Sequence, residues 1–516
     1  MKIMFKQLSK VAMLLAITTL VLTSCKKEET PNPGPGLTGK SEVYVLNNAG
    51  GSDISGAIKF EERTDNSTLI SIELTGATGD HPAHIHANSA AEGGGILIDL
   101  TLIDASGESV TEVTALNDGT VITYDQLIDF DGYVNVHKSA DELGVLVSQG
   151  DIGQNALTGE FKNYKLEEVK TGVNGVIQFN ERNNGETLVV ITLKGTSAGD
   201  EHAAHVHANT VSEGGGILVT FNKVDGATGV SKTNVSMLDD GTAINFKEWA
   251  NFNGYVQVHD TNGTPIARGD IGKNKFTGES EMYDLNAKSN PNISGTAKFE
   301  ERVSGATLVT IMLDNTTMGD SHPAHIHMGT AAVGGGIVIS LTAINGDNGL
   351  SYTNVSALND ETSITYDELI EFDGYVNVHK SVAELGVLVA QGDIGQNALT
   401  GTEMVYDLNE IKAQGVSGTI TFSERNNGFT LVSIAISGAG VVGDQAAHIH
   451  DNNVAMGGGV TISLSKVNAD GVSLTSVTAL NDGTEMKYAD MIGFNGYAQV
   501  HNPDLSALTN GNIGSN

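Results

Sequence analysis

The sequence predicts an all-β protein of four tandem antiparallel β-sandwich or barrel domains, each of about 120 residues. Glycine is abundant at 63 residues, proline is scarce at 8, and charged residues make up only 17% of the chain, a composition typical of short strands joined by turns. Apolar and polar residues alternate over strand-length runs. A short motif that opens each unit recurs with one long period, at Leu37–Gly39, Leu157–Gly159, Phe276–Gly278 and Leu399–Gly401.

The first residues form a targeting segment. A basic start precedes the apolar run Val11–Val21, which is short for a membrane span, and Leu22–Cys25 follows it. These features resemble a bacterial lipoprotein signal with its lipobox. The resemblance implies that residues 1–24 are removed and that a lipidated Cys25 anchors the protein to a membrane surface. An ordinary signal peptide with a chance cysteine is the alternative.

Residues 25–36 are expected to form a flexible tether, since three of them are prolines. The acidic pair Glu28 and Glu29 resembles surface-export signals of bacterial lipoproteins. Cys25 is the only cysteine, so the domains have neither a disulfide nor a thiolate ligand. We therefore expect an outer-membrane lipoprotein of the bacterial cell envelope, either exposed at the cell surface or facing the periplasm.

Each repeat is long enough to be a domain with its own core. A Gly-Asp-Ile-Gly motif, or its variant Gly511–Gly514, closes every unit. Units one and three resemble each other most closely, as do units two and four, which indicates a pair of domains duplicated as a pair. The predicted domains are residues 37–156, 157–275, 276–398 and 399–516.

Within the first unit, alternating or apolar runs predict at least six strands, separated by turn residues. A polar and apolar run at helical spacing, Tyr124–Phe130, predicts one or two helical turns. The predicted strands are Ser55–Phe60, Thr68–Leu74, Ala83–His86, Gly95–Leu102, Val110–Ala115 and Tyr133–His137.

All fifteen histidines belong to one repeated pattern. A His-x-His pair lies in the middle of each unit, and a further histidine ends a strand-like run roughly fifty residues later. Successive side chains of a strand point to opposite faces, so both histidines of a pair share one face. The three of each unit are His84, His86 and His137; His205, His207 and His259; His325, His327 and His379; and His448, His450 and His501.

If the two strands are neighbours, three imidazoles converge, and three histidines with an open fourth position are typical of copper or zinc sites. The alternative is a hydrogen-bonded network that ties strands together. Two further sets of residues are candidates for supporting the ligands. They are His81, His202 and His322, replaced by Gln445 in the fourth unit, and Asp80, Asp200, Asp320 and Asp444, for which a turn position is the favoured interpretation.

The opening motif, the Ala-His-Ile-His run at Ala83–His86, the Tyr-Val-Asn-Val-His run at Tyr133–His137 and the closing run at Ile266–Gly269 together resemble the CHRD domain, first described in chordin. The resemblance covers residues 37–516 as four copies. It implies an all-β fold and no defined activity. Units one, three and four depart from the closing pattern, with Gln149, Gln391 and Asn510 where unit two has Arg268.

Two functions from different classes remain open. The first is a non-catalytic, membrane-anchored binding or adhesion array for an unknown surface ligand or protein, whose domains each hold a transition metal. The second is a copper-dependent redox enzyme, because the histidine pattern also resembles the copper ligands of Cu,Zn superoxide dismutase. The formal charge of −34 argues against nucleic acid as a partner. We find no nucleophile beside a base, so hydrolase chemistry is not indicated.

Overall fold

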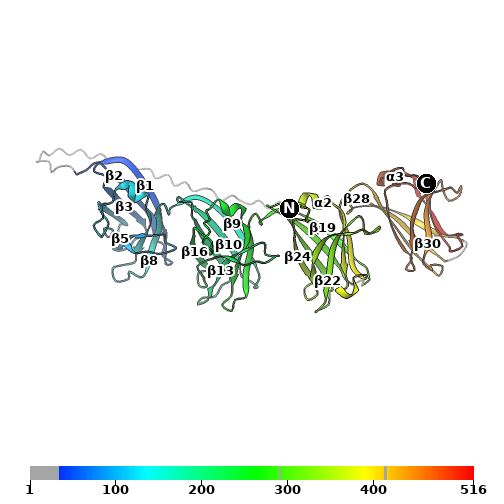
Figure 1. The fold of residues 1–516 in the computed structure, drawn as a ribbon, viewed down its shortest axis with the longest axis horizontal. Coiled ribbons are helices and arrows are strands. Elements are labelled where there is room, and N and C mark those ends of the chain that lie inside the picture. The colour runs from blue at the N-terminus through cyan, green and yellow to red at the C-terminus, as the bar shows by residue number, and fades with distance from the viewer. Residues whose placement is uncertain (1–33, 290–291, 412–414) are drawn as a thin grey trace. The chain divides into compact units, whose positions relative to one another are not determined.

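The computed structural model describes residues 34–289, 292–411 and 415–516. It confirms an all-β protein in which four antiparallel sheets follow one another along the chain, one in each predicted repeat (Figure 1). The described residues divide after Gln154 into two compact units. The predicted signal, Cys25 and most of the tether lie outside the described residues.

The first sheet has the strand order β5-β4-β7-β8-β1-β2-β3-β6. All six predicted strands form, and the run at Gly95–Leu102 is shorter than expected. The predicted helical turns form α1, where Thr123 and Gln126 make a capping box. The elements are β1 (Leu37–Asn48), β2 (Ser55–Arg63), β3 (Thr68–Thr75), β4 (Ala83–Ala87), β5 (Ile96–Asp99), β6 (Glu108–Val113), α1 (Tyr124–Ile128), β7 (Asp131–His137) and β8 (Leu146–Gly153).

The second sheet has ten strands because two short ones extend its edge. A single 3₁₀ turn, η1 (Glu248–Asn251), takes the place of the short helix and buries Trp249. The strands are β9 (Leu157–Glu168), β10 (Asn174–Arg182), β11 (Thr187–Lys194), β12 (Glu201–His202), β13 (Ala204–Ala208), β14 (Ile217–Thr220), β15 (Val224–Asp225), β16 (Val230–Val235), β17 (Asn253–His259) and β18 (Pro265–Gly272).

The third sheet closes into a barrel, because β23 also pairs with β24. Its elements are β19 (Phe276–Ala287), β20 (Ser294–Arg302), β21 (Thr307–Asp314), β22 (Ser321–Met328), β23 (Ile337–Asn345), β24 (Leu350–Val355), α2 (Tyr366–Ile370), β25 (Asp373–His379), η2 (Val382–Glu384) and β26 (Leu388–Gly395). The fourth sheet repeats the strand order of the first. Its elements are β27 (Leu399–Glu410), β28 (Ser417–Arg425), β29 (Thr430–Ser437), β30 (Gln445–Asp451), β31 (Val460–Val467), β32 (Val472–Val477), α3 (Tyr488–Gly493), β33 (Asn495–His501) and β34 (Ala507–Gly514).

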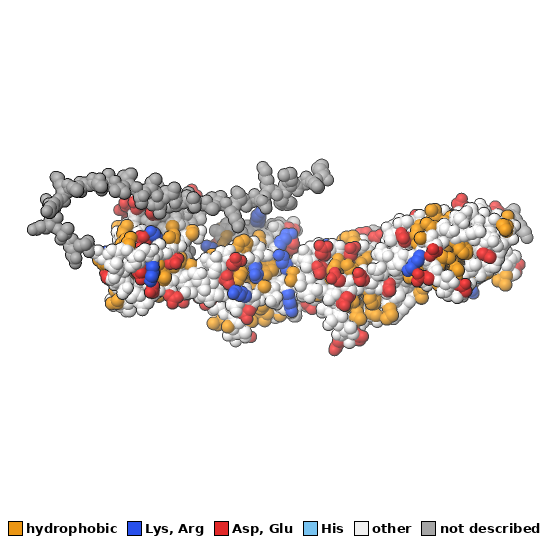
Figure 2. Space-filling view, turned by 90° about the horizontal axis from the view of Figure 1, so that it is seen from above, with side chains coloured by type: hydrophobic (Ala, Val, Ile, Leu, Met, Phe, Trp, Pro, Cys, Tyr) orange, Lys and Arg blue, Asp and Glu red, His pale blue; other side chains and the backbone are white. Residues whose placement is uncertain are grey.

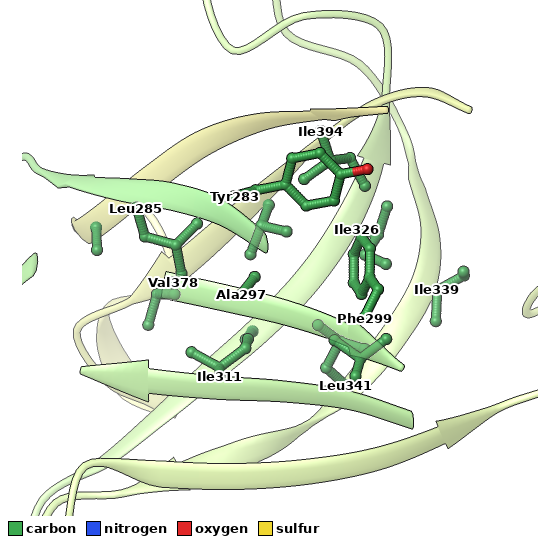
Figure 3. Close-up of a cluster of buried hydrophobic side chains, with 14 of the residues drawn as sticks. Tyr283, Leu285, Ala297, Phe299, Ile311, Ile326, Ile339, Leu341, Val378 and Ile394 are labelled. Carbon is green, nitrogen blue, oxygen red and sulfur yellow. The ribbon is translucent and has the colours of Figure 1, made fainter. Parts of the chain in front are cut away.

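Each sheet curls around an apolar core. The core consists of the alternate side chains of each strand that point inward. Figure 3 shows the core of the third barrel, where Phe299 of β20 and Ile326 of β22 point into the interior. Both side chains are fully buried, and burial of such a side chain contributes about 1.5–3 kcal/mol. The alternation predicted from the sequence therefore supplies the core.

Buried arginines connect neighbouring domains within residues 155–516. Arg302 of β20 pairs with Asp270 of β18 at 2.7 Å and also donates to the carbonyl of Asn274. Arg425 makes the same pair with Asp393, at 2.7 Å. These aspartates belong to the closing motif of the preceding domain, so the motif joins that domain to the next one.

No helix among the described residues is long and apolar enough to cross a membrane. Figure 2 shows acidic side chains spread over the visible face, as the strongly negative formal charge leads one to expect.

Candidate metal centre

The two histidine-bearing strands of the first domain are neighbours. β4 pairs with β7 in a register that sets His84 opposite Asn135 and His86 opposite Tyr133. Ile85 and Val134, which alternate with them, are fully buried in the core. The histidines therefore line the other face of this strand pair, as the strand period predicts.

Three imidazoles converge on this face in every domain. In each cluster, one ligand atom per histidine lies within 4.8 Å of the other two. In the first domain the rings of His84 and His137 have centroids 5.1 Å apart, and those of His84 and His86 are 6.0 Å apart. The structure thus brings together the complete predicted set: His84, His86 and His137; His205, His207 and His259; His325, His327 and His379; and His448, His450 and His501.

Backbone carbonyls determine the tautomer of two histidines in each cluster. His86 Nδ1 lies 3.0 Å from the carbonyl oxygen of Gly94, and His137 Nδ1 lies 2.5 Å from that of Leu143. A carbonyl oxygen only accepts, so each Nδ1 carries the hydrogen and each Nε2 keeps its lone pair. The equivalent carbonyls in the other domains belong to Gly215 and Gly263, Gly335 and Leu385, and Gly458 and Leu505.

The first histidine of each His-x-His pair turns its Nδ1, and not its Nε2, toward the cluster. His84 Nδ1 is buried without a hydrogen-bond partner, and so is His137 Nε2. In the third domain His325 Nδ1 lies 3.1 Å from His379 Nε2, and the fourth domain has the same contact at 3.1 Å. Such a contact is either a hydrogen bond between two imidazoles or a pair of lone pairs turned toward one ion. Each cluster therefore offers one Nδ1 and two Nε2 atoms.

Burial lowers the pKa of several imidazoles in the clusters. It lowers the pKa of His84, and the neighbouring His137 lowers it further. Burial also lowers the pKa of His137, although the hydrogen bond to Leu143 opposes this. Since a metal binds the neutral imidazole, these shifts reduce competition from protons near neutral pH. The pKa of His205, His325, His379 and His448 is lowered by burial in the same way.

Stacking and a glycine turn orient His86. Its ring stacks on Tyr133 with centroids 4.8 Å apart, and the Tyr133 hydroxyl accepts the Gly94 N–H at 3.0 Å. A Cβ on Gly94 would lie 2.0 Å from the Ala87 carbonyl oxygen, so only glycine brings this turn to the imidazole. The glycine run directly follows a turn, at residues 90–92 in the first domain, and lies against the strand that carries the His-x-His pair.

The additional histidines support the third ligand strand. His81 Nδ1 donates to the carbonyl of His137 at 3.1 Å, and His202 and His322 make the same bond to His259 and His379. Gln445 uses its amide instead, donating to Gly440 and accepting from Val442. These residues lie outside the clusters.

The four aspartates that were candidates for orienting the histidines do not bond to their rings in the described part of the chain. Asp80, Asp320 and Asp444 are exposed, Asp200 is partly buried, and no hydrogen bond or ion pair joins any of these four to an imidazole in the described residues. The backbone N–H groups of Asp200 and Asp320 close turns by bonding to Ser197 and Thr317, in line with the favoured interpretation for these two residues.

A different carboxylate, missed in the sequence, lies beside the first cluster: Asp99 Oδ1 is 3.6 Å from His84 Nε2. Asp99 could not be predicted, because the residue opposite His84 depends on how two strands are aligned, and the sequence of one strand does not show that alignment. Side-chain amides also lie beside the clusters. Asn135 Nδ2 lies 3.5 Å from His86 Nε2, and Gln257 Nε2 lies 3.3 Å from His259 Nε2.

No family model and no curated protein matches this chain. One matching solved structure is a tetra-tandem repeat in the extending region of a large adhesion protein. It has 13% identity and a TM-score of 0.11, with 88% of this chain and 97% of that chain covered. Another is the BSP domain of a biofilm-associated protein, with 10% identity, a TM-score of 0.13, and 95% and 99% covered. With TM-scores this low, the two likenesses carry no structural argument.

Proposed function

We propose that this protein is a membrane-anchored, non-catalytic array whose four β domains each bind one transition-metal ion, copper or zinc, through three histidines. The CHRD resemblance belongs to the same proposal, since it covers all four domains. Repetition supports a binding role, because four tethered sites raise the effective affinity for a surface partner, whereas one site suffices for catalysis.

One observation carries the proposal: in every domain an Nδ1 and two Nε2 atoms turn toward one point, with the other nitrogens of two imidazoles held by backbone carbonyls. The second nitrogen of a metal-ligating histidine commonly donates its N–H to such an acceptor. Imidazoles suit copper and zinc, and three of them leave a coordination position for water or a ligand.

The test is a calorimetric titration of residues 26–516 with Zn²⁺ and Cu²⁺. We expect four ions per chain. His86→Ala should reduce this number to three, because one ligand of the first site is lost. His81→Ala is the matched control and should keep four, since His81 bonds only to the backbone of the ligand strand. A chain that binds no ion, or a His86→Ala variant that still binds four, contradicts the proposal.

The anchor is a separate part of the proposal and lies at Cys25, outside the described residues. We expect Cys25→Ala to abolish incorporation of a radiolabelled fatty acid and to release the protein from the envelope fraction. Labelling equal to that of the parent chain would refute the anchor and leave the metal sites untouched.

The copper redox alternative is tested on the copper-loaded chain. The array proposal expects superoxide consumption no faster than that of free copper at the same concentration. A faster rate that disappears in the His86→Ala variant would favour the redox enzyme.

A further inference from the structure

We propose that the four metal sites fall into two affinity classes, with Asp99 and Asp239 making the sites of domains one and two tighter than those of domains three and four. This inference rests on the proposed function. It divides the domains as one and two against three and four, whereas the sequence motifs pair one with three and two with four.

The first histidine of each cluster has a fixed strand partner. Register sets His84 opposite Asp99, and it sets the corresponding histidines of the other domains opposite Thr220, Ser340 and Ser463. Only the first domain therefore has a carboxylate at this strand position.

In the first domain, the Asp99 carboxylate lies on the outer side of His84. It is 3.6 Å from Nε2, while the buried Nδ1 faces the cluster. This separation is longer than a direct hydrogen bond, so Asp99 acts through its charge or through a bridging water. Two bonds with Asn117 hold the aspartate in place, at 3.1 Å each.

In the second domain, the acid comes from the other residue of the same pair. Asp239 occupies the Asn117 position, and its carboxylate accepts the N–H of Thr220 at 3.0 Å and its hydroxyl at 2.7 Å. Because Thr220 lies opposite His205 in the strand register, these two bonds hold the Asp239 carboxylate beside that strand position. A carboxylate is thus present, although the strand partner is threonine.

In the third and fourth domains both residues are neutral. Ser340 pairs with Asn359, and Ser463 pairs with Asn481, through the same backbone and side-chain bonds. Register sets Ser340 opposite His325 and Ser463 opposite His448, so neither histidine has a carboxylate in this pair of residues.

A negative charge behind a ligating imidazole strengthens metal binding in two ways. It favours the tautomer that carries the hydrogen on the second nitrogen, either through its charge or through a bridging water, and it makes the ligand nitrogen more basic. Loss of such a partner typically lowers metal affinity 10–100-fold. Because Asp99 is two-thirds exposed, solvent screens its charge, and we expect an effect of about tenfold.

The experiment is a competition titration of residues 26–516 with Zn²⁺ against a chromophoric chelator, which resolves the affinity of each class. We expect two tighter and two weaker sites, about tenfold apart. Asp99→Ser, which copies the third domain, should leave one tighter site, whereas Asp99→Glu should keep two. Ser340→Asp should create a third tighter site. Since the effect comes from charge, raising the salt concentration should reduce the difference in zinc affinity between the tighter and the weaker sites.

Four equal sites in the parent chain, or an unchanged class ratio in both Asp99→Ser and Ser340→Asp, would overturn the inference while leaving metal binding intact. A chain without any bound zinc contradicts the proposed function itself. Asp99 and Ser340 lie on exposed strand positions, and Ser340→Asp measures a gain, so misfolding does not imitate the expected result.

Discussion

Two histidines separated by one residue present different nitrogens to the same cluster. The Nδ1–H of His86 donates a hydrogen bond to the Gly94 carbonyl, whereas no acceptor among the described residues lies at the Nδ1 of His84. The difference arises because the glycine turn folds back beside the second histidine alone. The position of the Gly94 carbonyl therefore decides which nitrogen His86 presents, as the Leu143 carbonyl does for His137.

The metal-free chain should become less stable as the pH falls below about 6.5, the ordinary pKa of histidine. Burial lowers the pKa of His84 and His137 in the folded state, so the unfolded chain binds more protons below that value. The free energy of unfolding must then decrease as the pH drops from about 6.5 toward the folded-state pKa.

Urea denaturation on both sides of pH 6.5, without metal, measures this dependence. A His84→Gln variant, which cannot take up the proton, should show a smaller dependence in its first domain. Stability that is constant or rises on acidification within this range would contradict the prediction.

The glycine turn is an element whose backbone forms part of the site. We expect Gly94→Ala to destabilise the first domain by about 1–3 kcal/mol and to weaken its metal site, because the new Cβ would press on the Ala87 carbonyl. Gly95→Ala is the matched control, since a Cβ there meets nothing within 4 Å.

Thermal unfolding and zinc titration of both variants test the turn. Equal behaviour of the two would show that the close approach of Gly94 to Ala87 has no role in the site.

The buried arginine links strands of successive domains. Arg302 and Asp270 are 1% and 7% exposed, and burial raises the pKa of Asp270 although Arg302 opposes this. Removing one partner of a buried ion pair leaves an uncompensated charge, which costs about 3–5 kcal/mol. We expect Arg302→Met to be destabilising by this amount, measured by urea denaturation.

Lys298→Met is the control, because its pair with Glu300 is partly exposed and contributes about 1 kcal/mol or less. The double variant Asp270→Asn with Arg302→Met should recover part of the loss. A cost for Arg302→Met no larger than that of the control would exclude a structural role for the pair.

At the scale of the whole molecule, we predict that residues 157–275 fold alone, because their sheet has its own core. Separation removes Arg302 and leaves Asp270 without its cation, so Asp270→Asn should stabilise the isolated domain. The same change should destabilise residues 26–516, where Arg302 is present.

Circular dichroism shows whether the isolated domain folds. Thermal unfolding measures whether Asp270→Asn stabilises the isolated domain and destabilises residues 26–516. An unfolded isolated domain would contradict its independence, and effects of equal sign would contradict the role of the pair. The fourth domain offers a natural comparison, since Asn512 keeps the bond to the Val454 N–H without a carboxylate charge.

The repeats, the strand faces and the histidine set are determined by local features of the sequence. A strand has a period of two whatever its neighbours, so Ile85 and Val134 were assignable to the core and His84 and His86 to the opposite face. The short helix was also predictable, because its cap lies within four residues.

The strand neighbours, the nitrogen that each imidazole presents and the carboxylates beside the clusters were decided by tertiary structure alone. His84 meets Asp99 through strand register, and Arg302 meets Asp270 across a domain boundary. A repeat shows which residues recur but not which of them touch. Contacts between residues far apart in the chain depend on how whole sheets curl and close, and no local pattern encodes that.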